Sequence, residues 1–158
     1  MALREIRLQG DPVLNKVCRP VETLTSRLQE LIDDMLDTMY EAQGVGLAAP
    51  QVGVLRRIVV IDVGEGPIVM INPEILETSG EQCGMEGCLS VPGKAAEVTR
   101  PNYVKAKELN ENMEEFTLEA ERLLARCICH ENDHLDGIMY EDKAVGPVVL
   151  NTRENGWA

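Results

Sequence analysis

The chain has only two histidines, and they lie four residues apart with a glutamate directly after the first. Positions four apart in a helix share one face, so His130 and His134 can present two imidazole nitrogens to one metal ion. Glu131 can reach a water on that ion, which is the arrangement of H-E-x-x-H metallohydrolases. Two unrelated surface histidines are the alternative, but the spacing and the glutamate favour a metal site.

A catalytic site of this kind usually takes three protein ligands and keeps one open position. Because there is no third histidine, the remaining ligand must be a carboxylate or a thiolate. Glu141 and Asp142 follow the helix and stay candidates, whereas Asp136 is expected on its wrong side. Cys88 is the stronger candidate, because Gly87 removes bulk beside it and lets the backbone bring the sulfur close to an ion.

The other four cysteines are weaker candidates. Cys127 lies one turn below His130, too far along the axis to share one ion with His134, and is expected as a small buried residue. Cys129 points about 100° away from its neighbouring histidine. Five cysteines is an odd number, which argues against a full disulfide framework. Cys18 and Cys83 are therefore expected to be structural.

Residues 44–51 (GVGLAAPQ) are small, apolar and uncharged, and three interpretations stay open. A phosphate loop is disfavoured, because the third glycine is missing and a helix rather than a strand precedes it. A tight connection packed under a sheet is the second interpretation. The third is a strand that lines a substrate site, with free backbone groups and the Gln51 amide as a donor.

Two helices and several strands must position these residues. Apolar side chains recur every three or four residues over 26–42, where Ser26 and Gln29 resemble a capping box. A second helix is expected over 119–136, ending at Gly137 and carrying the histidines. Strands are expected over 55–62 and 68–72 around a turn at 64–67, and a hairpin over 104–109 and 114–118. Residues 80–93 are expected to be irregular.

Composition bounds the answer further. A chain of 158 residues predicts one catalytic domain, residues 1–158, with a short tail from 143 to 158. A formal net charge of −12 argues against direct nucleic-acid binding, which needs lysine and arginine. The sequence has no apolar run long enough for a membrane span and no secretory signal. The sequence therefore predicts a cytoplasmic protein of α+β class.

Three segments together resemble the signature motifs of the peptide deformylase family: residues 44–51 (GVGLAAPQ), 86–90 (EGCLS) and 130–134 (HENDH). They stand in the family's order, and the likeness extends from about residue 6 to residue 140. The resemblance implies antiparallel or mixed sheets around a central H-E-x-x-H helix. It also implies a bacterial enzyme that removes the N-formyl group from the formylmethionine of nascent chains and releases formate.

The resemblance implies roles for individual residues. Cys88, His130 and His134 would bind one divalent ion, Fe(II) in many native enzymes, with Zn(II), Ni(II) or Co(II) able to replace it. Metal-bound water would attack the formyl carbon, with Glu131 as general base and then general acid. The side chain of Gln51 and the backbone N–H of Leu89 would stabilise the oxyanion. The expected substrate-binding residues are Val45, Gly46, Leu123 and Cys127.

Some features depart from the family pattern or go beyond its motifs. Cys129 replaces a common glutamine, and Arg126 stands where many relatives are apolar, so the pocket rim is expected to differ. Glu86 and Arg100 are expected to form an ion pair that fixes the Cys88 loop. The tail is not basic, and residues 145–150 look strand-like, so docking on the ribosome through a basic helix is not expected, although transient ribosome proximity is.

Two other functions remain open at this stage. A small zinc peptidase would cleave internal peptide bonds and take an acidic third ligand. A structural metal-binding module would have a closed site, against which Glu131 counts, since such a site does not need a base. Formate release from formyl-Met-Ala-Ser, with acetylated and unblocked peptides as controls, separates the three.

Overall fold

The computed structural model describes residues 2–150. Its elements, in chain order, are η1 (Pro12–Asn15), α1 (Ser26–Glu41), β1 (Gly46–Ala48), η2 (Ala49–Val52), β2 (Ile58–Ile61), β3 (Ile68–Ser79), β4 (Gln82–Cys88), β5 (Val91–Arg100), β6 (Tyr103–Leu109), β7 (Glu115–Glu121), α2 (Arg122–Leu135), η3 (Tyr140–Lys143) and β8 (Val149–Leu150). The predicted α+β class is confirmed.

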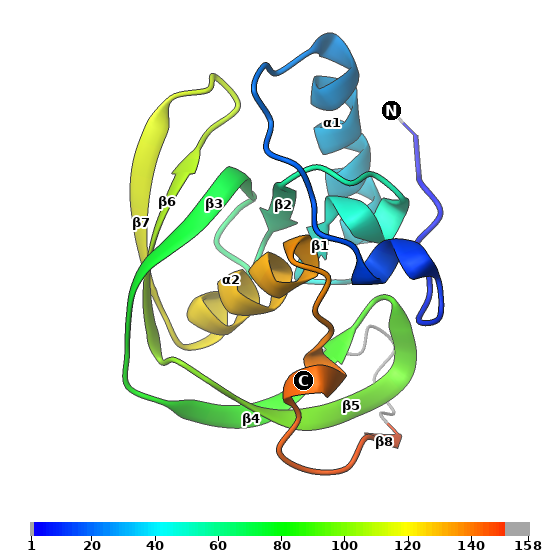
Figure 1. Cartoon of the computed structure of the whole chain (residues 1–158), viewed down its shortest axis with the longest axis vertical. Helices are drawn as coiled ribbons and strands as arrows, with labels where there is room; N and C mark the ends of the chain where they lie inside the picture. Colours follow the sequence, from blue (N-terminus) through cyan, green and yellow to red (C-terminus); the bar gives the residue numbers. More distant parts are fainter. Residues whose placement is uncertain (1, 151–158) are drawn as a thin grey trace.

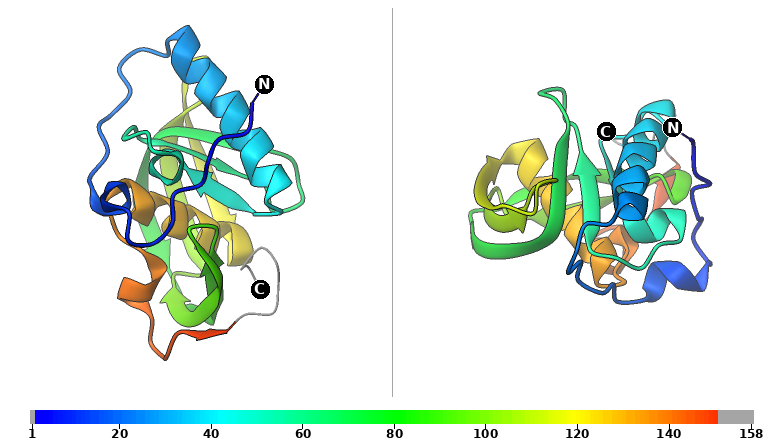
Figure 2. Two further views of the ribbon diagram at one scale, coloured as in Figure 1. Left: turned by 90° about the vertical axis from the view of Figure 1, so that its right-hand side faces the viewer. Right: turned by 90° about the horizontal axis from the view of Figure 1, so that it is seen from above.

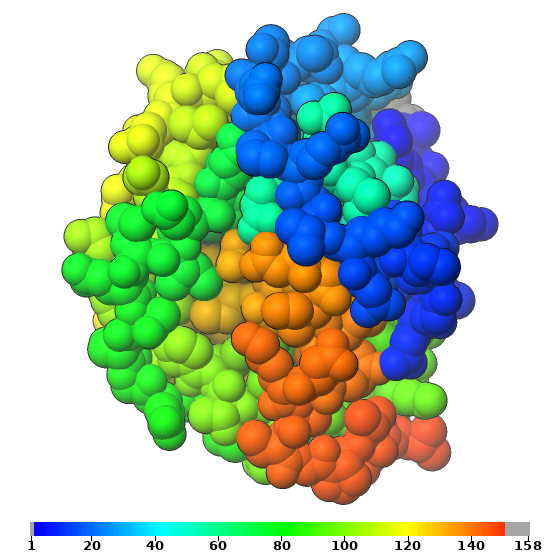
Figure 3. Space-filling view, in the orientation of Figure 1, coloured from blue at the N-terminus to red at the C-terminus, as the bar shows by residue number. Residues whose placement is uncertain are grey.

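The strands form two sheets around α2. One sheet has the order β1-β2-β3-β6-β7 and the other the order β4-β5-β8, and every pair of neighbouring strands is antiparallel. Figure 1 shows α2 between the two sheets, with the β4–β5 hairpin passing beneath it. Part of α2 is visible at the surface in Figure 3, beside the blue N-terminal segment.

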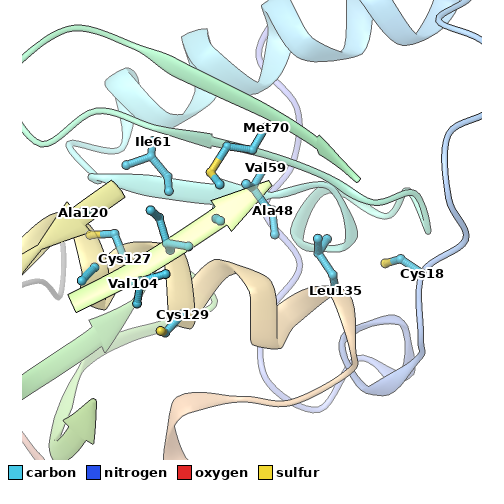
Figure 4. Packing of buried hydrophobic residues seen from close by; sticks show 13 residues of the cluster. Cys18, Ala48, Val59, Ile61, Met70, Val104, Ala120, Cys127, Cys129 and Leu135 are labelled. Carbon is cyan, nitrogen blue, oxygen red and sulfur yellow. The ribbon is translucent and has the colours of Figure 1, made fainter. Parts of the chain in front are cut away.

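The short strand β2 is buried on both faces because a helix covers each one. Ile58 and Val60 join a cluster with α1, which includes Ile32 and Met35. Alternate side chains of a strand point to opposite faces. Accordingly, Val59 and Ile61 join the cluster that α2 contributes to, and Figure 4 shows their side chains near that helix. Figure 2 shows α1 along the outer side of the five-stranded sheet.

The first helix agrees with its predicted range, but its cap differs. It spans Ser26–Glu41, and the N-cap is Thr25, whose hydroxyl accepts a hydrogen bond from the Leu28 backbone N–H at 3.2 Å. The predicted capping box at Ser26 and Gln29 is therefore wrong by one residue. The hydroxyl of a threonine in extended conformation satisfies one of the otherwise unpaired N–H groups of the first turn.

The second helix begins later than predicted. Strand β7 continues through Glu121, and Tyr103 lies opposite Glu121 while Val104 lies opposite Ala120. Alanine and glutamate favour helices intrinsically, but here the cross-strand pairing with β6 overrides that preference. Arg122 then turns the chain with a positive φ of 57°, and α2 begins there.

Residues 80–93, expected to be irregular, instead form most of a hairpin. They contain β4 and the start of β5, which pair from Gln82 opposite Arg100 to Cys88 opposite Val91. Glycine is depleted in strands, and the glycines of this segment led to the wrong prediction. The predicted strand at 55–62 is shorter in the structure, the one at 68–72 is longer, and the predicted 104–118 hairpin is confirmed as β6–β7.

The end of the described chain adds a strand. Val149 and Leu150 form β8, which pairs with β5, so the strand-like pattern of residues 145–150 is confirmed only for these last two residues. The rest of the predicted tail, residues 151–158, lies outside the described residues. Among residues 2–150, none of the helices combines the length and the apolar character needed to cross a bilayer.

Glu108 is a buried carboxylate in β6 without a hydrogen-bond partner among the described residues. Burial raises its pKa from 4.5 to about 8. Between these values the unfolded chain ionises while the folded chain stays protonated. The contribution of Glu108 to folding is therefore most favourable below pH 4.5 and is lost as the pH rises toward 8.

We expect Glu108→Gln to remove this loss, because the amide keeps the shape of the protonated acid and does not ionise. The two proteins should unfold with similar free energies near pH 4.5, and the variant should be more stable by about 2–4 kcal/mol near pH 8. Urea unfolding at several pH values measures this difference. Parallel curves for the two proteins across the range would contradict it.

Candidate metal centre

Three buried side chains from two elements meet at one point. The group consists of Cys88 at the end of β4 and His130 and His134 in α2, and their candidate ligand atoms all lie within 4.8 Å of one another. The Cys88 Sγ atom lies 3.3 Å from the His134 Nε2 atom. The two imidazole rings have centroids 4.9 Å apart and planes at 72°. One sulfur and two nitrogens at these separations suit a tetrahedral ion with a fourth position left over.

Glu86 orients the first histidine. Its Oε1 atom lies 2.9 Å from the His130 Nδ1 atom, and the carboxylate is fully buried. Burial would raise the pKa of Glu86, but the hydrogen bonds from His130 and Arg100 outweigh it and lower that pKa to about 2. An ionised carboxylate only accepts hydrogen bonds, so Nδ1 carries the proton and Nε2 keeps its lone pair for an ion.

The electrostatic surroundings of the two histidines differ. Burial would lower the pKa of His130, but hydrogen bonds with Cys88 and Glu86 outweigh it and raise that pKa to about 10. Burial lowers the pKa of His134 well below its usual value. The protein therefore stabilises positive charge at the first histidine and keeps the second neutral. The negative surroundings that raise the pKa of His130 would equally favour a metal cation, which would displace the proton from its Nε2 atom, and His134 is already the neutral imidazole that a metal ion needs. The ring of Tyr140 stacks on His130 at a centroid distance of 6.0 Å.

Glu131 lies beside the three-residue group and faces β1. A Cβ atom at Gly46 would come within 2.5 Å of its Oε2 atom, so the carboxylate occupies the space that a side chain at position 46 would need. Its Oε1 atom is buried without a hydrogen-bond partner among the described residues. Burial raises the pKa of Glu131 to about 7. A buried carboxylate with one free oxygen and a pKa near neutrality can both take and return a proton.

Gln51, the last residue of the segment 44–51, connects this segment with Cys88. Its Oε1 atom accepts a hydrogen bond from the Ala48 backbone N–H at 3.0 Å. Its Nε2 atom donates to Ser90 Oγ at 3.0 Å and lies 3.5 Å from Cys88 Sγ. Leu89, which lies between Cys88 and Ser90 in the sequence, is buried. The predicted oxyanion donors therefore lie next to the sulfur. Ser90 belongs to the 86–90 motif, but its contact with Gln51 was not predicted from the sequence, because the two residues are 39 positions apart.

The expected substrate-binding residues differ in burial. Gly46 and Cys127 are buried, Val45 is partly buried against the same cluster as Cys127, and Leu123 is 39% exposed. Gly46 belongs to β1, which lies at one end of the five-stranded sheet and pairs there with β2. Of the three interpretations of residues 44–51, this arrangement favours a strand next to the site.

The acidic candidates for the third ligand lie outside the group. Asp136 pairs with Arg57 at 3.0 Å, on the wrong side as predicted. Glu141 contacts Gln9, and Asp142 accepts a hydrogen bond from the Met139 backbone N–H. Within residues 2–150, the only group of the required kind is Cys88 with the two histidines.

The other cysteines are not part of this group. Cys18, Cys127 and Cys129 are buried in the apolar cluster of Figure 4, and Cys83 is exposed. Burial raises the pKa of Cys129 to about 11, so its thiol is protonated at neutral pH. It is therefore less reactive than an exposed thiol, although it directly precedes His130.

Two arginines hold Glu86. The expected ion pair with Arg100 is present, with donor–acceptor distances of 2.9 and 3.0 Å. Arg126, predicted at a pocket rim, is instead buried and donates to Glu86 Oε2 at 2.6 Å. The sequence did not predict this contact, because the partners of Arg126 lie in strands that are far from it along the chain. Its position four residues before His130, on the same helix face, was the available signal.

Comparisons with known proteins agree with this geometry. The model of the polypeptide deformylase family matches residues 3–148. A peptide deformylase of Agathobacter rectalis is 71% identical over 155 residues, covering 98% of each chain.

Solved structures give the same result. The crystal structure of peptide deformylase from Thermotoga maritima has a TM-score of 0.90 and 43% identity, covering 92% of this chain and 100% of the other. That of a peptide deformylase from Synechococcus elongatus in complex with actinonin has a TM-score of 0.88 and 42% identity, covering 90% and 79%. With its sequence matched almost end to end and its fold shared, the chain belongs to the polypeptide deformylase family.

Proposed function

We propose that this chain hydrolyses the N-formyl group of formylmethionyl peptides and releases formate, using one divalent ion held by Cys88, His130 and His134. The observation that carries the proposal is the buried group of one sulfur and two nitrogens with a free carboxylate beside it. Family membership supports the substrate class. A cytoplasmic bacterial location and transient proximity to the ribosome would follow from a nascent-chain substrate.

The donor set fits a divalent ion. Its three ligand atoms come from a rigid helix and the end of a strand, and all three side chains are buried. When bound, the ion would act as a Lewis acid and lower the pKa of a coordinated water. The same three ligands accept Fe(II), Zn(II), Ni(II) and Co(II), and the family resemblance points to Fe(II) as the native ion. Metal analysis after anaerobic purification identifies it.

Glu131 would move the proton. Its free Oε1 atom can accept a proton from the attacking water, and burial keeps its pKa near 7, where the group can give the proton up again. The departing amine is the acceptor of that proton. Gly46 leaves the space in which the carboxylate lies, so the backbone of β1 fixes its position.

Gln51 and Leu89 would stabilise the developing oxyanion. The Gln51 amide is held on both sides, with Oε1 bonded to Ala48 and Nε2 to Ser90, and it therefore needs little reorganisation. The backbone N–H of Leu89 directly follows the Cys88 ligand. Two fixed donors next to the ion would give the site its preference for the transition state over the ground state.

Replacing Gln51 by alanine is expected to lower kcat about a hundredfold with a small change in KM, because a donor to the oxyanion is lost. Metal content should stay at that of the parent protein. Gln82→Ala is the matched control, since Gln82 binds backbone carbonyls of Pro101 and Arg122 at the far end of β4. Equal kcat for the two variants would contradict the role of Gln51.

Substrate recognition would combine an apolar side-chain contact with backbone pairing. Val45, Cys127 and Leu123 would contact the methionine side chain, and Gly46 with its neighbours in β1 would pair with the extended peptide. A formyl group carries only hydrogen beyond its carbonyl, so a tight site would reject an acetyl group by shape.

The proposed function is tested by formate release. The metal-loaded protein should release formate from formyl-Met-Ala-Ser and leave acetyl-Met-Ala-Ser and unblocked Met-Ala-Ser unchanged. Loss of formate release after chelation, and its return after Fe(II) or Co(II) is added, would show that the ion is required. Cleavage within the unblocked peptide, or the absence of formate from a metal-loaded protein, would overturn the proposal.

A further inference from the structure

The carboxylate of Glu86 is held by more cationic groups than a single ion pair would supply. Its Oε1 atom contacts Arg100 and His130, and its Oε2 atom contacts Arg100 and Arg126. All four residues are buried. A buried carboxylate is costly unless its lone pairs are satisfied, and here both oxygens have two partners each.

Arg100 alone cannot balance this cluster. Its Nη1 atom donates to Asp133 at 2.7 Å while its Nε and Nη2 atoms bind Glu86, so one guanidinium serves two carboxylates. Arg126 supplies the second buried positive charge, at 2.6 Å from Glu86 Oε2. Lys143 lies 3.3 Å from Asp133 and is 45% exposed, so it neutralises the outer carboxylate rather than Glu86.

Arg126 also connects the two elements that carry the ligands. Its Nη1 atom donates to the Val98 carbonyl in β5 at 3.1 Å and lies 3.4 Å from the Gly84 carbonyl in β4. Cys88 lies in that same strand, and Arg126 itself lies in α2, one turn before His130. A Cβ atom at Gly84 would come within 3.3 Å of the guanidinium, so the glycine makes room for it.

We propose that Arg126 is a positioning residue for the metal centre: through Glu86 it fixes the His130 ring, and through the strand carbonyls it fixes the hairpin that carries Cys88. The inference deepens the proposed function, on which it rests for the identity of the ligands. Partners of metal ligands typically change metal affinity about 10–100-fold when removed.

The test measures Co(II) binding to the metal-free protein and the d–d and thiolate charge-transfer bands of the Co(II) form. Arg126→Met should weaken Co(II) binding at least about tenfold and shift these bands. Its kcat should fall with little change in KM. Arg126→Lys keeps a positive charge near Glu86 and should recover part of the affinity. If the methionine variant does not fold, the lysine variant decides by the same measurements.

A matched control distinguishes positioning from general packing. Arg57→Met removes another arginine that holds α2, since Arg57 donates to the Leu135 carbonyl and to Asp136, but it does not contact Glu86. This variant should bind Co(II) within about twofold of the parent. Equal weakening by the two methionine variants would overturn the proposal.

A double-mutant cycle tests the route through Glu86. In a Glu86→Gln background, Arg126→Met should weaken Co(II) binding by much less than it does alone, because the two residues act on the same ring. Full additivity, or Co(II) binding by Arg126→Met equal to the parent's, would overturn the inference. Formate release by the parent protein is measured separately, so a protein without deformylase activity refutes the proposed function and leaves this test intact.

Discussion

Replacing Cys88 by alanine is expected to abolish metal retention and, with it, formate release. The substitution removes one of the three proposed ligands and the only one that would be anionic and so would partly neutralise the ion. Even indirect partners of ligands are worth about 10–100-fold in metal affinity, so losing a direct ligand should cost more than about a hundredfold. Metal content after dialysis and direct titration of the metal-free protein with Co(II) measure this loss.

Cys129 provides the matched control for that experiment. It is also buried and lies next to His130, but it is outside the ligand group. Cys129→Ala should keep the metal and most of the activity. If the Cys88 variant retained one ion per chain with the parent's affinity while the Cys129 variant lost it, the ligand assignment would be wrong.

The second large effect is expected for Glu131→Gln. Glutamine keeps the size of the side chain but cannot take a proton, so kcat should fall about a thousandfold, within the range that general acid–base catalysis supplies. Since Glu131 is not in the ligand group, metal content and KM should stay close to those of the parent. Single-turnover formate release and metal analysis on the same preparation measure both quantities.

Asp136→Asn serves as the control for the loss of a negative charge in this region. Asp136 directly follows α2 and pairs with Arg57, away from the ligand group. Its variant should keep kcat within a few-fold. A Glu131→Gln protein with more than a tenth of the parent's kcat would show that another group moves the proton.

The helix face that carries the histidines could be predicted from sequence because it is a local property. A spacing of four residues in a helix places His130 and His134 on the same face, whatever the rest of the chain does. The third ligand could not be settled locally, because Cys88 and His134 are 46 residues apart and meet only through the β4–β5 hairpin. From residue spacing, Cys88, Glu141 and Asp142 all remained candidates for the third ligand, and the family resemblance was needed to choose among them.

The errors in the fold have a common cause, which is tertiary pairing that overrides local preference. Residues 119–121 are composed like a helix but end a strand because β6 lies beside them. Residues 82–88 contain two glycines but form a strand because β5 pairs with them. The buried position of Arg126 was not predicted, because a charged side chain is rarely buried without partners, and its partners are three atoms of distant strands.

The division of the ligands between a hairpin and a helix has a thermodynamic consequence. An ion that binds all three side chains would connect β4 directly to α2. Along the chain, three further strands separate these two elements. Separating β4 from α2 must first release the ion. The free energy of metal binding is therefore added to the free energy needed to separate these two elements. Metal supply would therefore govern how long the folded chain survives as well as how fast it turns over.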